Sequence, residues 1–216
     1  MLVAMGLAVD GCIVPADAYN AFVERAPAPD AAIVSAGDAG EACSDVLSGG
    51  PSGIFFGACL VTADYGDPTK ATYVKLDVTV TAAPGASTGS ITTQMTNLVL
   101  NPSNISQTTG ATSTPPAVPF AADCTYVVDA GTTTIAAAAN SFGAPLVLAN
   151  TVYRGKLLTA DSSCADLDAT ITMPVNFNLE LGGNTCVFRR APADGAVTLF
   201  TASDFACPGA PGAPPM

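Results

Sequence analysis

Ala-Thr-Ile-Thr-Met-Pro-Val-Asn-Phe-Asn-Leu-Glu-Leu, residues 169–181, is the stretch that decides the fold. Every odd position from Ala169 to Leu181 is apolar, and every even position is polar or proline. Successive side chains of a strand point to opposite faces, so this period of two predicts a strand with one buried face. A helix would spread the same apolar residues around its whole circumference. The segment Gly-Gly-Asn at 182–184 then predicts a turn into a second strand over 185–189.

The chain before this hairpin contains further segments of strand length. Residues 52–61 form a continuous apolar run, and residues 72–82 alternate apolar and polar side chains. Residues 90–101 change their apolar face between Met95 and Leu98, which a β-bulge near Asn97 would explain. Residues 101–119 are rich in Ser, Thr and Pro and are expected to form a long loop.

Three more segments follow before the hairpin. Asp-Ala-Gly at 129–131 predicts a tight turn between strands over 124–129 and 132–139, although residues 136–139 also suit a helical turn. Another strand is expected over 152–160. Residues 161–168 are interpreted as a turn that carries Cys164.

About eight strands, joined mostly by hairpins and without amphipathic helices between them, predict an all-β fold. We expect an antiparallel up-and-down β-barrel, with a β-sandwich as the alternative. Long strands would leave exposed edges in an open sheet, and this favours the barrel. The interior residues expected to contact a ligand are Val74, Leu76, Val78, Ile171, Val175, Phe177 and Leu179.

Composition limits the classes of partner. The chain has 216 residues, enough for one domain with flanking segments. Its 7 basic and 18 acidic residues give a formal net charge of −11. Such a surface repels nucleic acid and anionic lipid head groups, so we expect neither as a direct partner.

The N-terminus suggests export. Residues 1–9 are an apolar run too short to span a bilayer, and Asp-Gly-Cys follows at 10–12. This pattern resembles a bacterial lipoprotein signal, which implies a signal segment over 1–11 and lipidation of Cys12. No basic residue precedes the run and Asp10 stands where a small uncharged residue is usual. A plain secretory signal and an uncleaved apolar N-terminus are therefore the alternatives.

The remaining chain is divided into three parts by composition. Residues 12–50 are expected to form a flexible lipid-anchored tether with a possible short helix over 17–25. Residues 51–191 form the barrel domain. Residues 192–216 form a loose Pro/Gly-rich tail, in which only residues 197–200 resemble a strand.

Cysteine content agrees with an oxidising compartment. If Cys12 carries lipid, an even number of cysteines is left to form three disulfides. These cysteines are Cys43, Cys59, Cys124, Cys164, Cys186 and Cys207. The chain has no C-x-x-C spacing and no His, which excludes zinc-ribbon, c-type haem and thioredoxin-like sites. Six cysteines allow fifteen pairings. A bond between Cys164 and Cys186 is expected because their strands should be neighbours.

Two short motifs resemble those of lipocalins. Ser-Gly-Ile-Phe at 52–55 and Cys-Val-Phe-Arg-Arg at 186–190 resemble the lipocalin Gly-x-aromatic start and late Arg. In lipocalins that Arg packs across the aromatic ring and closes the barrel floor. Phe55 replaces the usual Trp, and the intervening motifs are missing. The chain also resembles uncharacterised barrel-type envelope lipoproteins of high-GC bacteria, which have no assigned activity.

Catalytic chemistry has little support in the sequence. Without His, Ser-His-Asp and Cys-His arrangements are absent, and oxidised thiols cannot act as nucleophiles. Asp168 and Glu180 are a pair of carboxylates, but solvated surface acids are the favoured interpretation. The oxygen-rich segment 161–168 lacks the glycine and ligand spacing of a calcium loop. We therefore expect no catalytic residue, metal or cofactor, and no enzyme.

Two functional hypotheses follow. The first is an exported, lipid-anchored protein of the outer membrane or cell surface whose barrel binds a small apolar ligand. The alternative is a structural or protein-interaction lipoprotein whose barrel is filled by its own side chains. An eight-stranded barrel is just wide enough for either. An apolar void of roughly several hundred Å³ would favour the first hypothesis.

Overall fold

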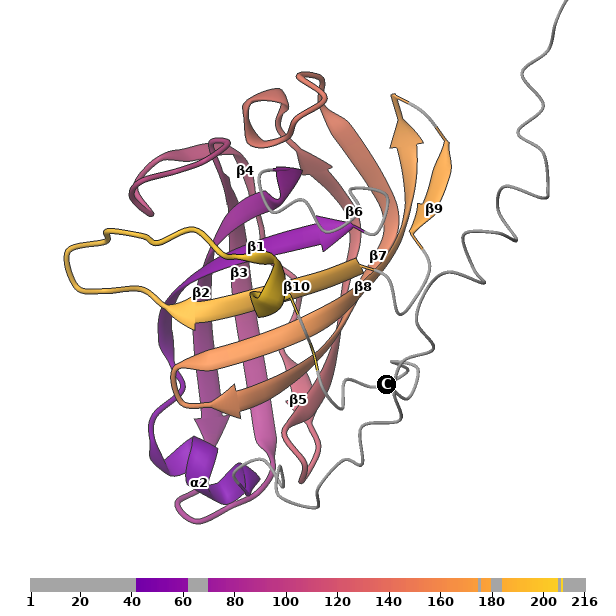
Figure 1. The fold of residues 1–216 in the computed structure, drawn as a ribbon. Helices are drawn as coiled ribbons and strands as arrows, with labels where there is room; N and C mark the ends of the chain where they lie inside the picture. The colour runs from indigo at the N-terminus through magenta and orange to yellow at the C-terminus, as the bar shows by residue number, and fades with distance from the viewer. Residues whose placement is uncertain (1–41, 62–69, 175, 180–183, 206, 208–216) are drawn as a thin grey trace, which may run out of the picture. The chain divides into compact units, whose positions relative to one another are not determined.

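The computed structural model describes residues 42–61, 70–174, 176–179, 184–205 and 207 (Figure 1). Several sequence predictions lie outside the described residues: the expected signal segment over 1–11, Cys12, the expected helix over 17–25, Val175, Glu180 and the side chain of Phe177. The described part contains the short helix α2 and a sheet. Its strands are β1 (Gly53–Val61), β2 (Thr72–Ala82), β3 (Gly89–Leu98), β4 (Thr108–Ser113), β5 (Val118–Phe120), β6 (Thr125–Ile135), β7 (Leu146–Thr159), β8 (Ser162–Met173), β9 (Phe177–Leu179) and β10 (Asn184–Arg190).

The sheet is a closed antiparallel barrel of eight strands, as the sequence predicts. Consecutive strands pair from β1 to β3 and, through β5, on to β8. β10 then pairs with both β8 and β1 and closes the barrel. The two other strands lengthen the wall: β4 pairs with β3 beyond the part that β5 covers, and β9 pairs with β8 beyond the part that β10 covers.

Alternation along the strands separates an inner core from an outer face. Val74, Leu76 and Val78 of β2 are buried together in the inner core, as predicted. Tyr73 has the opposite parity along β2, so its side chain points to the outer face, where it belongs to a second apolar cluster. The bulge expected near Asn97 is confirmed by a register shift between Thr96 and Leu98 where β3 pairs with β4.

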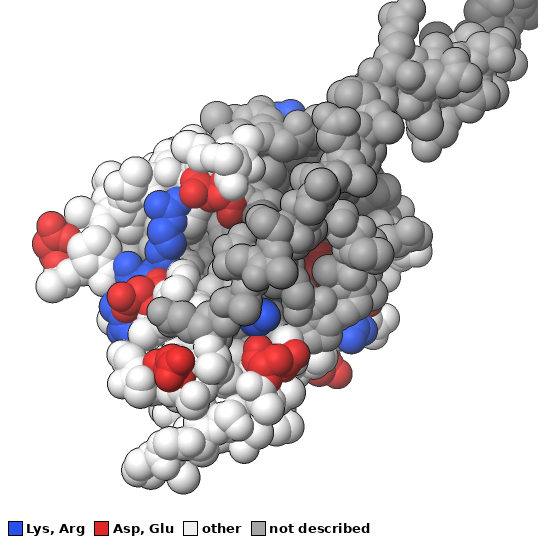
Figure 2. Space-filling view, turned by 60° about the horizontal axis from the view of Figure 1, so that its bottom comes forward, with Lys and Arg blue, Asp and Glu red and all other residues white. Residues whose placement is uncertain are grey.

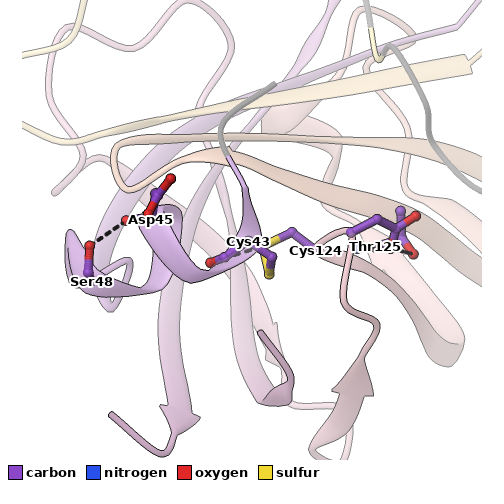
Figure 3. Close-up of a disulfide and its surroundings, with 6 residues drawn as sticks. Cys43, Asp45, Ser48, Cys124 and Thr125 are labelled. Atoms are coloured by element: carbon purple, nitrogen blue, oxygen red, sulfur yellow. Dashed lines mark hydrogen bonds between the residues drawn. A yellow bond between two sulfur atoms is a disulfide. The ribbon is translucent and has the colours of Figure 1, made fainter. Parts of the chain in front are cut away.

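One end of the barrel is covered by α2 (Cys43–Ser48). Cys43 and Val46 are buried in the inner core, and a disulfide joins Cys43 to Cys124 in the turn before β6 (Figure 3). The folded unit therefore begins before residue 51, and the expected tether boundary at residue 50 is too late.

At the same end of the barrel, the side chain of Arg190 connects several segments of the chain. Its guanidinium carbon lies 5.1 Å from the centroid of the Phe55 ring. The guanidinium donates to the carbonyls of Gly50, Ser52 and Ala160, each at 2.8 Å, and pairs with the Asp161 carboxylate. Arg190 of the last strand thus packs across the aromatic ring of Phe55 on the first strand.

The segment after β10 covers part of the outer face. Phe200 is only 4 % exposed and stacks on Phe56, with ring centroids 5.2 Å apart. The Arg189 guanidinium lies 4.1 Å from the Phe200 ring centroid and its Nη2 lies 3.2 Å from Oδ2 of Asp204. The expected loose tail is therefore wrong for residues 192–205. The expected strand over 197–200 is also absent from this described segment, which makes a single bridge between Asn104 and Ala196.

Residues 169–181, in which the sequence predicts one strand, do not form a continuous strand. β8 ends at Met173, which is 56 % exposed, and the chain reverses so that β9 pairs with β8. Pro174 has no N–H group to continue a ladder, which explains the break. The register pairs Ala169 with Leu179, and both are buried in the inner core. The choice of buried face is correct at these two positions.

Other boundaries also differ from the expectations. Residues 129–131 form an irregular part of β6 instead of a hairpin, and the Asp129 carboxylate accepts the Gly131 N–H at 2.8 Å. The expected loop over 101–119 contains β4 and the start of β5. The expected turn over 161–168 is mostly strand β8. The helical turn considered at 136–139 is present as a 3₁₀ helix over Ala137–Ala139.

All six predicted cysteines form disulfides, but the expected Cys164–Cys186 pair is wrong. The bonds are Cys43–Cys124, Cys59–Cys186 and Cys164–Cys207. β8 and β10 are neighbours, yet Cys164 lies opposite Val187 and Cys186 lies opposite Ala165. This offset of one residue puts the two sulfurs on opposite faces of the wall.

Candidate functional site

A cavity of about 230 Å³ lies inside the barrel. Its inner wall comes from β2, β3, β6, β7, β8 and β10 and is formed by Leu76, Thr93, Met95, Asn97, Tyr126, Val128, Tyr153, Ala165 and Phe188. The inner core next to α2 is filled instead by side chains such as Val46, Phe120 and Leu157. The barrel is therefore packed in one part and hollow in another.

The cavity opens between β4 and β6. It touches residues 111–113 of β4 and residues 132–135 of β6. Successive side chains of a strand point to opposite faces, so a cavity that touches consecutive residues also reaches the edge of that strand. At this level of the barrel, β3 pairs with β4. Farther along the barrel, β5 pairs with both β3 and β6 and so connects them. This interruption of the wall forms the mouth.

Two glycines make room for the aromatic rings of the cavity wall. Gly155 of β7 lies opposite Tyr126, and a Cβ atom there would stand 2.3 Å from the ring. Gly57 of β1 lies opposite Phe188 and has the same relation to its ring, also at 2.3 Å. Each ring lies against the backbone of the neighbouring strand because that strand has no side chain at the contact.

Two polar side chains of β3 project into the cavity. Thr93 and Asn97 are each only 8 % exposed and share their face with Ile91 and Met95. The Asn97 amide donates from Nδ2 to the carbonyl of Thr134 on β6, at 3.1 Å. This hydrogen bond lies at the mouth of the cavity and connects β3 directly to β6.

Tyr126 and Tyr153 are neutral over the physiological pH range. Burial raises the pKa of each phenol to about 12, and a hydrogen bond with Ser163 opposes the rise for Tyr126. The Tyr153 hydroxyl lies 3.6 Å from Sδ of Met95. Both phenols therefore present neutral hydroxyl groups to the interior.

The charged side chains that the structure describes do not line the cavity. The described residues that line it include no Asp, Glu, Lys or Arg. The Lys75–Asp77 ion pair, at 3.3 Å, occupies positions of β2 that alternate with the buried Val74, Leu76 and Val78. On the face shown in Figure 2, acidic and basic side chains lie among a larger number of uncharged ones. The described lining of the cavity is therefore uncharged.

Among the predicted ligand-contacting residues, Leu76 lines the cavity. Val74, Val78 and Leu179 are buried in the inner core, and Ile171 is half-buried against it, but none of these four contacts the cavity. The sequence interpretation missed Thr93, Asn97, Tyr126 and Tyr153. Ile91, Thr93, Met95 and Asn97 follow one another at every second position, so their shared parity in the sequence was a signal that Thr93 and Asn97 point inward with Ile91 and Met95.

The acidic residues considered for chemistry do not gather in the described part of the chain. Asp168 is half-buried on β8, and Glu180 is outside the described residues. No group of three potential His, Cys, Asp or Glu ligands occurs among the residues that the structure describes. In the same part of the chain, no helix has the length and apolar character needed to cross a membrane.

Comparisons with protein-family models, curated proteins and solved structures found no significant match. The function of the cavity is therefore inferred from its own geometry.

Proposed function

We propose that this protein binds one small, mainly apolar molecule inside its barrel. The observation that carries the proposal is the cavity of about 230 Å³ with its mouth between β4 and β6. Ligand sites are typically concave and lined by apolar and aromatic side chains with a few polar groups. The mixture of Leu76, Val128 and Phe188 with Thr93 and Asn97 has this character.

The size of the cavity limits the ligand. An apolar cavity of roughly 150 Å³ accepts benzene. Scaled in proportion, 230 Å³ accommodates ~9 non-hydrogen atoms. This is smaller than the several hundred Å³ anticipated for a ligand-binding barrel, because α2 and the side chains near it fill one part of the interior. A long fatty chain does not fit, and a molecule of one or two rings does.

We further propose that the protein is an exported, lipid-anchored envelope protein with a lipocalin-like barrel. Three disulfides support an oxidising compartment, and the N-terminal sequence supports a lipid on Cys12. The contact of Arg190 with Phe55 supports the likeness to lipocalins. Replacing Cys12→Ser should release the protein from membranes into the soluble fraction. Retention of the variant on membranes would exclude the lipid anchor.

Binding is tested by native mass spectrometry of protein purified from its source, where a co-purifying molecule of the expected size supports the proposal. A cavity-filling variant provides the matched test. Ala165 of β8 is 1 % exposed and lines the cavity, so Ala165→Leu should abolish the bound mass while the protein stays folded.

The control variant is Ala169→Leu. Ala169 lies on the same strand and the same face, but it is packed in the inner core away from the cavity. Overpacking there should cost ~1–3 kcal/mol of stability and leave binding intact. If no molecule co-purifies and Ala165→Leu is as destabilising as Ala169→Leu, the interior is effectively packed. The alternative of a structural or protein-interaction role would then be favoured.

A further inference from the structure

The polar side chains of the cavity require an explanation. Thr93 and Asn97 are more than nine-tenths buried, yet they occupy inward positions of β3 where an apolar side chain would pack without cost. The Asn97 Oδ1 and the Thr93 hydroxyl are not among the buried polar atoms that lack a partner, so both keep exposure to the space of the cavity. Asn97 uses its Nδ2 for the Thr134 carbonyl, while its Oδ1 and the Thr93 hydroxyl make no hydrogen bond to another described residue.

The orientation of the Asn97 amide is fixed by its partner. The backbone carbonyl of Thr134 only accepts hydrogen bonds, so the amide must direct its NH₂ group toward β6. The carbonyl oxygen Oδ1 is then the free end of the side chain at the cavity. A ligand meets a hydrogen-bond acceptor at this point.

We infer that the cavity selects an uncharged molecule with a hydrogen-bond donor, which binds to Oδ1 of Asn97, with the Thr93 hydroxyl as a second polar contact. This inference rests on the proposed function and adds the chemical class of the ligand. Alcohols, primary amides and N–H heterocycles of one or two rings belong to the class. Carboxylates and ammonium ions do not.

The exclusion of ions follows from the lining. Transfer of an ion from water into a cavity without an opposite charge carries a large desolvation penalty. The described lining has no charged side chain. The two phenols that face the cavity are protonated at neutral pH, and burial moves their pKa values still farther above it. A charged ligand therefore gains no ion pair to offset its lost hydration.

Two pairs of probes separate these features. Indole and indene match in size and shape, but only indole has an N–H donor. Phenylacetamide and phenylacetate match in shape, but only phenylacetate is charged at pH 7. Isothermal titration calorimetry with the full chain should show indole binding ~3- to 10-fold tighter than indene, the value of one hydrogen bond. Phenylacetamide should bind and phenylacetate should not.

Variants assign the preference to residues. Asn97→Leu should reduce the ratio of the indole affinity to the indene affinity to about one, while indene still binds. The isosteric Thr93→Val should lower this affinity ratio in part. A purely structural role of either side chain would change stability and leave the ratio unaltered. If Asn97→Leu does not fold, Thr93→Val and the wild-type ratios still decide the question.

The outcomes distinguish this inference from the proposed function. If indene binds as tightly as indole, or phenylacetate as tightly as phenylacetamide, the cavity binds molecules but the selection inferred here is wrong. If none of the four probes binds and no molecule co-purifies, the proposed function fails and the inference fails with it.

Discussion

Truncation of Phe200 tests whether the segment after β10 is an integral part of the fold. The Phe200 ring is 4 % exposed and contacts three partners: the Phe56 ring at 5.2 Å, the Phe205 ring at 5.9 Å and the Arg189 guanidinium at 4.1 Å. Replacing a buried Phe by Ala typically costs ~3–5 kcal/mol. The lost stacking and cation–π contacts place Phe200→Ala in the upper half of that range.

The assay is chemical denaturation by urea, with the disulfides intact. Leu199→Ala is the matched control, since Leu199 is the preceding residue and is 37 % exposed. It should cost less than ~1 kcal/mol, because partly exposed side chains contribute little. If Phe200→Ala is no more destabilising than Leu199→Ala, the segment separates from the barrel before global unfolding, and its packing on Phe56 contributes nothing to the stability of the domain.

The remaining predictions concern the disulfides and the response to high pH. Removing the Cys43–Cys124 bond by the double change to Ala should cost ~4–5 kcal/mol in urea denaturation, because the bond closes a loop with a sequence separation of 81; a loss below ~1 kcal/mol would contradict this account. Thiol labelling of the unfolded, unreduced protein should modify none of the six paired cysteines, and any labelled one would disprove the pairing. Folded Tyr126 stays protonated to about pH 12, whereas the unfolded phenol ionises near pH 10. Stability should therefore fall by up to ~2–3 kcal/mol between these pH values, and Tyr126→Phe should remove that part of the loss.

The class of fold could be predicted because alternation is a local property of the chain. Val74, Leu76 and Val78 each contribute to one buried face whatever the neighbouring strands are. The break at Pro174 was also predictable in principle. A proline in the middle of an expected strand lacks the N–H group that a ladder needs, and it was interpreted only as a polar-face residue.

The disulfide pairing could not be predicted at the same level. Neighbouring strands were correctly expected for Cys164 and Cys186, but a pairing between strands depends on register as well as proximity. A shift of one residue exchanges the faces. Here Cys186 lies directly opposite Cys59 of β1 and bonds to it, and Cys164 faces outward toward Cys207.

The candidate site was only partly accessible from the sequence. A search for apolar inward positions finds Leu76 but passes over Asn97 and Thr93, because hydropathy alone assigns such side chains to the solvent face. The position of the cavity depends on where α2 fills the interior and where β4 leaves the wall incomplete. The position of α2 depends on contacts between segments far apart in the chain, such as the disulfide between Cys43 and Cys124.

The closure of the barrel by β1 and β10 has a consequence for the folding kinetics. These strands meet across a sequence separation of 127 at Cys59 and Cys186, whereas β7 and β8 are joined by a two-residue connection between Thr159 and Ser162. Contacts between residues so far apart in the sequence form slowly, since the chain loses its loop entropy before any strand pairing compensates for the loss. During oxidative refolding the β7–β8 hairpin should therefore gain amide protection early, and the Cys59–Cys186 bond should accumulate only as the last strand enters the wall.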